Sequence, residues 1–194
     1  GDNLYMAMEL LEGITLAEKI EKENVISFRD IQKIGIQILD AIEKVHGRNI
    51  IHRDLKPENV MLCVQDGNNE FVKLLDFGLA TMQYQTRLTQ TGVVIGTINY
   101  MSPEQITESR TSKASDIYSI GVMFYEMACG RKPFTGDTVV ALMKQIIDIS
   151  PIEPDRFRKD IPEAFNRLII QMLSKDADSR PGIEEIIHVI QSVE

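Results

Sequence analysis

Hydrophobic residues recur at helical spacing in the first part of the chain. Between Ser27 and Gly47 the apolar positions lie three or four residues apart, which is the spacing of a helix with one buried face. Ser27-Phe28-Arg29-Asp30 is a capping-box pattern, and Gly47 is suited to follow the last turn. The pattern therefore predicts a long amphipathic helix. Its apolar positions are Ile31, Ile34, Ile38, Ile42 and Val45.

Further helices are predicted in the second half of the chain. Residues 115–129 are apolar on nearly every face, which is typical of a buried central helix, and Gly130 and Pro133 mark its end. Three more helices are predicted at about 137–149, 162–173 and 183–193.

Two short apolar runs, residues 60–64 and 71–75, flank Asp66-Gly67-Asn68-Asn69, which indicates a β-hairpin with a longer loop. Residues 4–8 have the pattern of a buried strand, and a strand needs a neighbour to satisfy its backbone. We therefore expect the chain to begin inside a larger protein. Residues 77–101 carry a single charge and are rich in Thr, Gln and Gly, which favours a mobile loop. The predicted architecture is a helical bundle with a small hairpin at one end.

The acidic composition narrows the classes of function. A net charge of -8 argues against non-specific nucleic-acid binding, which needs basic surface to neutralise phosphates. The longest apolar stretch, residues 118–129, contains Glu126 and is too short to cross a bilayer. Cys63 and Cys129 lack metal-ligand spacing, so we expect buried free thiols in a reducing compartment. We assign the protein to the cytoplasm, which stays compatible with a membrane anchor outside this chain.

Polar side chains gather at the base of the predicted hairpin. Residues 52–59 lead into its first strand, and its second strand runs into Asp76. Because a hairpin brings its two ends together, we expect Asp54, Asn59 and Asp76 to converge. Oxygen donors of this kind are the ligands that Mg2+ prefers. An isolated Asp or Asn more often caps a turn, but here one hairpin places three such groups.

Three motifs in this region resemble those of the protein kinases. His52-Arg53-Asp54 with Asn59 resembles the catalytic loop, Asp76-Phe77-Gly78 the metal-binding triplet, and Ser102-Pro103-Glu104 the family's Ala-Pro-Glu. The chain is identified as a member of the protein serine/threonine kinases. Residues 88–97 and 133–137 are similar to the bacterial kinases of the eukaryotic-like type. The resemblance implies a kinase-like α+β fold, of which the chain covers the mainly α-helical large (C-terminal) lobe.

The resemblance also implies a role for each residue of the site. Asp54 would accept the proton of the substrate hydroxyl, and Lys56 would neutralise charge on the transferred phosphoryl group. Thr97 would hydrogen-bond near both of them, although by itself it is an ordinary loop threonine. Asn59 and Asp76 would hold Mg2+ at the phosphates of ATP. A lysine at position 56 resembles the serine/threonine class, so the implied substrates are Ser and Thr hydroxyls of proteins.

At the nucleotide end, the resemblance makes Met8 the gatekeeper residue. The backbone of Glu9 and Leu11 would hydrogen-bond adenine, and Met61 would pack beneath the purine ring. Thr15 is a candidate for a ribose contact. Without the resemblance, these positions are those of core residues in strands.

Other residues of the motifs are expected to be structural. Glu104 and Arg180 resemble the family's buried ion pair, although each alone is more often a solvated charge. Asp116 resembles the aspartate that anchors the catalytic loop, and its place at the start of the central helix also suits an N-cap. The remaining positions are expected to have packing or helix roles without chemistry: His52 and Phe77 in the hydrophobic interior, His46 and His188 on helices.

Arg53 precedes Asp54, an arrangement in which the resemblance implies that the arginine pairs with a phosphate on the activation segment. Thr86, Thr89 and Thr91 are the candidate phosphorylation sites. The resemblance also allows a dimer for autophosphorylation. The alternative is that these threonines belong to a flexible loop without regulation.

The Gly-rich loop and the strand lysine of a kinase's small lobe are missing from this sequence. The expected organisation is a partial catalytic domain over residues 1–194, with a hinge strand at about 4–12 and the large lobe at about 13–194. A catalytically inactive lobe that serves as a binding scaffold is one alternative, and a small-molecule phosphotransferase is another. Asp54, Lys56, Asn59 and Asp76 argue against the first; the peptide-docking region around Thr97 and Glu104 argues against the second.

Overall fold

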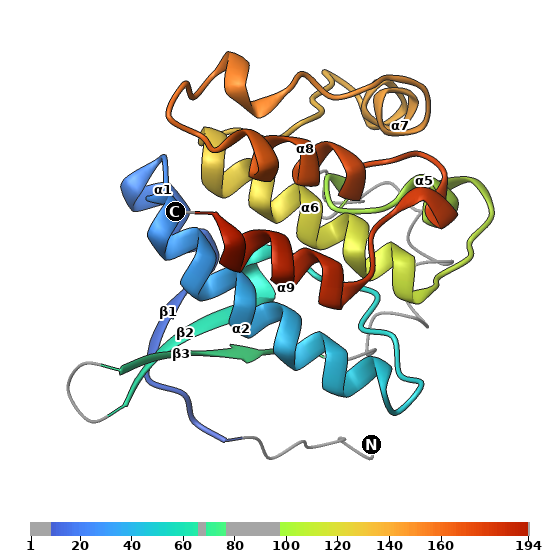
Figure 1. Ribbon diagram of the computed structural model, residues 1–194. Coiled ribbons are helices and arrows are strands. Elements are labelled where there is room, and N and C mark those ends of the chain that lie inside the picture. The colour runs from blue at the N-terminus through green and yellow to red at the C-terminus, as the bar shows by residue number, and fades with distance from the viewer. Residues whose placement is uncertain (1–8, 66–68, 77–97, 194) are drawn as a thin grey trace.

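A computed structural model describes residues 9–65, 69–76 and 98–193, and in it a small sheet lies along one side of a helical body (Figure 1). The strands are β1 (Gly13–Thr15), β2 (Val60–Gln65) and β3 (Asn69–Leu74). The helices are α1 (Leu16–Glu23), α2 (Phe28–His46), α5 (Pro103–Thr107), α6 (Lys113–Cys129), α7 (Val139–Asp148), α8 (Glu163–Met172) and α9 (Ile183–Ser192). Short 3-10 helices occupy Pro57–Asn59, Pro154–Arg156 and Ala177–Ser179.

Helix α2 forms where the hydrophobic pattern predicted it. The Ser27 hydroxyl accepts a hydrogen bond from the N–H of Asp30 at 3.1 Å, and Gly47 follows the last turn. The isoleucines of the predicted apolar face are buried against the rest of the helical body. The helix also lies close to α6, because a Cβ added at Gly35 would come within 2.8 Å of the Phe124 ring.

Helix α6 is the buried central helix that the sequence predicted, and the other helices surround it (Figure 1). It begins at Lys113, two residues before the predicted start, because Ser112 rather than a later residue is its N-cap. Gly121 lets α8 approach, since a Cβ there would lie 2.8 Å from the Cβ of Met172. Gly130 ends the helix in the left-handed conformation, with φ of 65°.

The sheet is antiparallel with the order β1-β2-β3. The predicted hairpin is therefore present as β2 and β3, in the register that pairs Val60 with Leu74. The predicted hinge strand is not seen over residues 9–12, where the chain has no strand, and residues 1–8 lie outside the described part. Strand pairing begins at Gly13 instead. The edge of β3 is covered by α2, whose Gln37 accepts a hydrogen bond from the N–H of Val72 at 2.9 Å.

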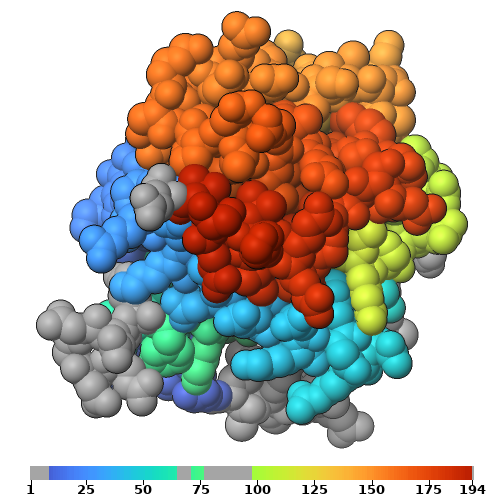
Figure 2. Space-filling model, in the orientation of Figure 1, coloured from blue at the N-terminus to red at the C-terminus, as the bar shows by residue number. Residues whose placement is uncertain are grey.

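The C-terminal helix packs across the surface of α2. Figure 2 shows the red residues of α9 beside the blue residues of the N-terminal part of the chain. The Gln32 side chain of α2 donates hydrogen bonds to the carbonyls of Ile190 and Val193, both at 2.8 Å. These bonds satisfy carbonyl groups at the end of α9 that have no partner within the helix.

Two further expectations concern exposure and membranes. Cys63 is buried and Cys129 is half-buried, and both are free thiols. Among the described residues, no helix combines the length and the apolar character that a bilayer span requires.

Candidate functional site

The loop between α2 and β2 brings three predicted site residues together. The Lys56 ammonium lies 3.0 Å from Oδ2 of Asp54. The Asn59 amide donates to the same Oδ2 at 3.1 Å and to the backbone carbonyl of Asp54 at 2.8 Å. Pro57 starts the 3-10 turn that folds Asn59 back toward Asp54. A carboxylate, an ammonium and an amide therefore form one hydrogen-bonded cluster.

Asp76 follows the end of β3, next to this cluster. The N–H of Leu75 donates to the carbonyl of Asn59 at 2.9 Å, so the backbone pairing of the hairpin continues up to the residue before Asp76. Asp76 is exposed and has a φ of 55°, a left-handed conformation that is uncommon for residues other than glycine. The backbone thus brings Asn59 and Asp76 to the same end of the hairpin, as predicted.

Asp116 of α6 holds the loop that carries Asp54. Its Oδ2 accepts the N–H of His52, and its Oδ1 accepts the N–H of Arg53, both at 3.0 Å. The N-cap alternative for Asp116 is wrong, because Ser112 caps α6 and Asp116 lies one turn inside it. His46, predicted only to lie on a helix, contacts Asp116 through Nε2 at 2.7 Å.

His52 is fully buried, as the resemblance implied, and it also makes a hydrogen bond that the pattern did not predict. Its Nε2 lies 3.0 Å from the carbonyl of Leu75, the residue before Asp76. Burial lowers the pKa of His52, although the nearby carboxylates of Asp116 and Asp54 act in the opposite direction. A neutral ring donates its one N–H to this carbonyl and so links the loop to the end of β3.

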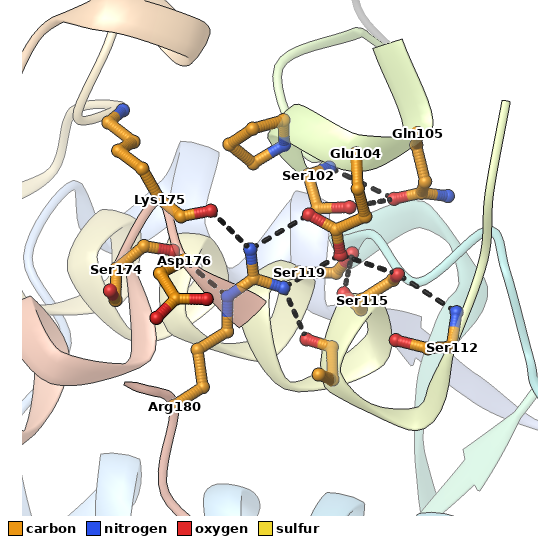
Figure 3. A network of polar contacts seen from close by, with 12 residues as sticks. Ser102, Glu104, Gln105, Ser112, Ser115, Ser119, Ser174, Lys175, Asp176 and Arg180 are labelled. Atoms are coloured by element: carbon orange, nitrogen blue, oxygen red, sulfur yellow. Dashed lines mark hydrogen bonds and ion pairs between the residues drawn. The ribbon is translucent and has the colours of Figure 1, made fainter. Parts of the chain in front are cut away.

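The predicted ion pair between Glu104 and Arg180 is present (Figure 3). Two guanidinium nitrogens of Arg180 bind the two oxygens of Glu104, each at 2.8 Å, and the Ser115 hydroxyl donates to Glu104 at 2.7 Å. Burial alone would raise the pKa of Glu104, but the hydrogen bonds from Arg180 and Ser115 outweigh it and lower the pKa to about 2. Arg180 also donates to the carbonyls of Ser174 and Ala114, so α5, α6 and the approach to α9 meet at one side chain.

A second buried cluster, centred on Tyr100, has no counterpart among the predicted site residues. The Tyr100 hydroxyl donates to Oε2 of Glu126 at 2.5 Å, and the Lys132 ammonium lies 3.1 Å from Oε1. The Ser119 hydroxyl donates to the backbone carbonyl of Tyr100 at 2.8 Å. Burial, reinforced by the Glu126 carboxylate, raises the pKa of Tyr100. This cluster fixes residues 98–102, just before α5, on the side of α6.

The residues predicted for the nucleotide end, where the structure describes them, lie around β1 and β2. Thr15 pairs with Met61 in the sheet, and Met61 pairs with Lys73 of β3. The Lys73 ammonium lies 2.5 Å from the Glu9 carboxylate. The Thr15 hydroxyl forms a capping box with Glu18 at the start of α1, a role that the sequence did not assign to it. Leu11 is half-buried.

Several predicted residues fall outside the part of the chain that the structure describes. These are Met8, Phe77, Thr86, Thr89, Thr91 and Thr97.

The family described as Protein kinase domain matches residues 1–190 of the chain. The chain belongs to the protein kinase family. Its relatives include the "Serine/threonine-protein kinase pkn3" of Myxococcus xanthus, which is 38% identical over 188 residues. That match covers 94% of this chain and 34% of the relative. The protein kinase fold here is mostly helical with a small antiparallel sheet of three strands.

Two other bacterial kinases give similar matches. The "Serine/threonine-protein kinase PknB" of Mycolicibacterium smegmatis is 35% identical over 178 residues, which are 91% of this chain and 28% of the relative. The "Serine/threonine-protein kinase PrkC" of Bacillus subtilis is 34% identical over 175 residues, which are 90% of this chain and 26% of the relative. The kinase chain thus spans about a third or less of the length of these relatives. The predicted membership of the serine/threonine-protein kinase family is confirmed.

Proposed function

We propose that this chain is the large lobe of a kinase that transfers the γ-phosphate of ATP to Ser or Thr hydroxyls of proteins. The observation that carries the proposal is the cluster at Asp54, where Lys56 and Asn59 both lie within hydrogen-bond distance of one carboxylate oxygen. Phosphoryl transfer depends mainly on positioning and on electrostatic stabilisation, and this cluster is suited to both.

Asp54 accepts the proton of the substrate hydroxyl and orients the hydroxyl toward the phosphoryl group. The Asp54 side chain is 12% exposed and that of Lys56 is 19% exposed, so both charged groups reach the surface while their neighbours hold them in place. The Lys56 ammonium offsets negative charge on the transferred group. Thr97 is assigned to the same region by its motif.

Asn59 and Asp76 are the residues that would hold magnesium. The donor set fits, because amide and carboxylate oxygens are hard ligands and the remaining positions of a magnesium ion are usually taken by water and substrate phosphates. Because the Asn59 amide nitrogen donates to Asp54, its carbonyl oxygen is the atom left to act as a ligand. When bound, the ion supplies positive charge at the phosphates of ATP.

The nucleotide end of the site is assigned to the start of the chain. Met8 is the gatekeeper residue, the backbone of Glu9 and Leu11 binds adenine, and Met61 packs against the purine ring. Thr15 is the candidate for a ribose contact, with its hydroxyl shared with the capping box of α1.

The domain assignment remains a hinge at about residues 4–12 and a large lobe at about 13–194. Three large apolar side chains on or beside β1 and β2 are exposed. They support the proposal that another part of the protein covers this side, because an exposed group of apolar residues usually marks a contact surface. The exposed fractions are 90% for Leu10, 45% for Ile14 and 55% for Val64.

Regulation is proposed on the activation segment. Phosphorylation of Thr89 or Thr91 adds a charge that a guanidinium binds in a fork geometry, and Arg53 is the assigned partner. Mass spectrometry of the active full-length kinase tests the modification. A double Thr→Ala variant with full activity contradicts it.

The function is tested with Asp54→Asn in the full-length parent. Transfer of radiolabel to protein should be abolished while ATP affinity stays nearly unchanged, because Asp54 is assigned to the hydroxyl and not to the nucleotide. Asp40→Asn, on the exposed side of α2, is the matched control and should retain transfer. Near-normal transfer by Asp54→Asn refutes the assignment and favours another role for the chain.

A further inference from the structure

Gln105, in the first turn of α5, connects that helix to the loop that carries Asp54. Its Oε1 accepts hydrogen bonds from the N–H and the hydroxyl of Ser102, at 2.9 and 3.0 Å. Its Nε2 donates to the backbone carbonyl of Arg53 at 3.3 Å. Figure 3 shows Gln105 beside Ser102 and Glu104 at the start of α5.

The carbonyl that Gln105 binds belongs to a residue in an uncommon conformation. Arg53 has a φ of 73°, in the left-handed region that side-chain-bearing residues rarely adopt. Surrounding contacts must hold such a residue in place. Asp116 accepts the N–H of Arg53 at 3.0 Å, and Gln105 takes its carbonyl. Side chains from two different helices therefore hold both backbone polar groups of the residue before Asp54.

Holding this carbonyl fixes more than Arg53 itself. The carbonyl of Arg53 and the N–H of Asp54 belong to one planar peptide unit. The orientation of that plane sets the direction in which the Asp54 side chain leaves the backbone. Lys56 and Asn59 then hold the end of the side chain. Gln105 instead holds the backbone from which this side chain extends.

Helix α5, which carries Gln105, is itself held in place by buried polar contacts. The adjacent Glu104 is bound through both carboxylate oxygens by Arg180, whose side chain is 0% exposed. Residues 98–102, which run directly into α5, are fixed to α6 by Tyr100. A side chain that extends from such a fixed helix restrains the Arg53–Asp54 peptide more tightly than a mobile surface side chain would.

We propose that Gln105 is a positioning residue, which keeps the Arg53–Asp54 peptide in the orientation that directs the Asp54 carboxylate to the substrate hydroxyl. The inference rests on the proposed kinase function. It predicts that loss of the Gln105 donor impairs turnover while leaving substrate binding intact, since both polar atoms of the Gln105 amide are bound within the chain, to Ser102 and to Arg53.

The test is Gln105→Glu in the full-length kinase. This change keeps the shape of the side chain and an acceptor for Ser102, but it replaces the donor to Arg53 with an oxygen that repels the carbonyl. We expect kcat to fall roughly 10- to 100-fold, the range in which a small misplacement of a catalytic group acts. The KM values for ATP and for a peptide substrate should stay close to those of the unaltered kinase. Amide hydrogen exchange in residues 51–59 should become faster.

Thr107→Ala is the matched control. The Thr107 hydroxyl donates to the carbonyl of Pro103 at 3.0 Å, so this change removes a hydrogen bond from the same helix without touching the loop. It should leave kcat and the exchange of residues 51–59 unchanged. Gln105→Met is the second variant, which lacks the donor but adds no charge, and its kcat should also fall.

Wild-type kcat in Gln105→Met, or an equal loss of kcat in Thr107→Ala, would overturn the inference. If Gln105→Glu folds poorly, the result for Gln105→Met decides. An unaltered parent that transfers no phosphate refutes the proposed function instead. In that case the exchange of residues 51–59 in the two Gln105 variants still reports whether this hydrogen bond holds the loop.

Discussion

His46 and Asp116 lie 70 residues apart in the sequence, yet Nε2 of His46 and Oδ2 of Asp116 are 2.7 Å apart in the interior of the protein. Asp116 is 1% exposed and also accepts the backbone N–H groups of His52 and Arg53. The Asp116 carboxylate of α6 therefore connects the end of α2 to the loop before Asp54. A buried carboxylate needs such partners, because an unpaired charge in the interior is costly.

Replacing His46 with leucine should destabilise the protein. The change removes one of the donors to the buried Asp116 carboxylate, and loss of a partner of a buried polar group costs about 1–3 kcal/mol. The free energy of unfolding in urea measures the effect. His188→Leu, at an exposed position of α9, is the control and should change stability by less than about 0.5 kcal/mol. Equal effects at the two positions would mean that the contact with Asp116 adds nothing.

Loss of Arg180 should be more damaging than loss of a surface charge. Arg180→Leu leaves the largely buried Glu104 carboxylate without its main partner, and breaking such a pair costs roughly 3–5 kcal/mol. Thermal or urea unfolding measures the loss. Arg167→Leu, which breaks the exposed pair with Glu163, is the control, since an exposed pair contributes about 1 kcal/mol or less. A loss at Arg180 no larger than at Arg167 would contradict the prediction.

The Glu104–Arg180 pair should also affect how the stability of the protein changes at acidic pH. The pKa of Glu104 is about 2, below its usual value of 4.5, so the ionised form is favoured in the folded state. A lowered pKa contributes stability that is present above the pKa of the unfolded chain and is lost as the pH falls toward the folded value. Stability should therefore decline between pH 4.5 and about 2, partly because of Glu104.

Glu104→Gln removes this contribution. The variant should be less stable at pH 7, and its stability should fall less steeply across the acid window. Urea unfolding at a series of pH values gives both quantities. Glu43→Gln, at an exposed position of α2, should keep the slope of the unaltered protein. An unchanged slope in Glu104→Gln would show that the pairing with Arg180 has no pH-dependent effect.

The elements that the sequence predicted are those with a clear hydrophobic pattern. Helix α2 has one apolar face and α6 is apolar on all sides, so both could be predicted from the sequence. Strand β1 was not, because three residues, Gly13–Thr15, carry too little pattern and are defined by pairing with β2. Helix α1 was missed although the capping box of Thr15 and Glu18 starts it.

The site divides in the same way. The placing of Asn59 and Asp76 at one end of the hairpin was predicted from the two strand patterns, and the Glu104–Arg180 pair was predicted from the family resemblance. The contacts of His46 with Asp116 and of Gln105 with Arg53 join segments that meet only in the folded chain. The hydrophobic periodicity of a sequence indicates which face of an element is buried. It does not indicate which polar group a buried side chain will bind. Such pairings therefore needed the structure.

The 194-residue chain alone should bind ATP–magnesium weakly and turn over negligibly. It holds the residues assigned to the hydroxyl and the metal, but its sequence lacks the Gly-rich loop and the strand lysine that position the phosphates in a kinase. Calorimetry and a peptide phosphorylation assay, with the full-length parent as the control, measure the two properties. Turnover by the chain comparable with that of the parent would show that positioning of the phosphates does not need those parts.

The contributions of Tyr100 and Lys132 to stability should be coupled, because both side chains bind the carboxylate of Glu126. Glu126 is buried, with 8% of its surface exposed. Tyr100→Phe removes a hydrogen bond to a charged group, which contributes about 1.5–3 kcal/mol. Lys132→Met removes the ammonium and keeps most of the aliphatic stem. Among the contacts of the described residues, each single change leaves Glu126 one of these two donors, whereas the double change removes both. The double variant should therefore lose more stability than the two single losses combined, by at least about 0.5 kcal/mol.

Urea unfolding of the wild type, the two single variants and the double variant measures this coupling. Lys144→Met, on the exposed side of α7, replaces Lys132→Met in the control cycle. Its effect should add to that of Tyr100→Phe, since Lys144 shares no partner with Tyr100 among the described contacts. Additive losses for Tyr100→Phe and Lys132→Met would mean that the two side chains stabilise the protein independently. Residues 98–102 would then owe their position on α6 to the Ser119 hydrogen bond and to packing, and not to the buried carboxylate.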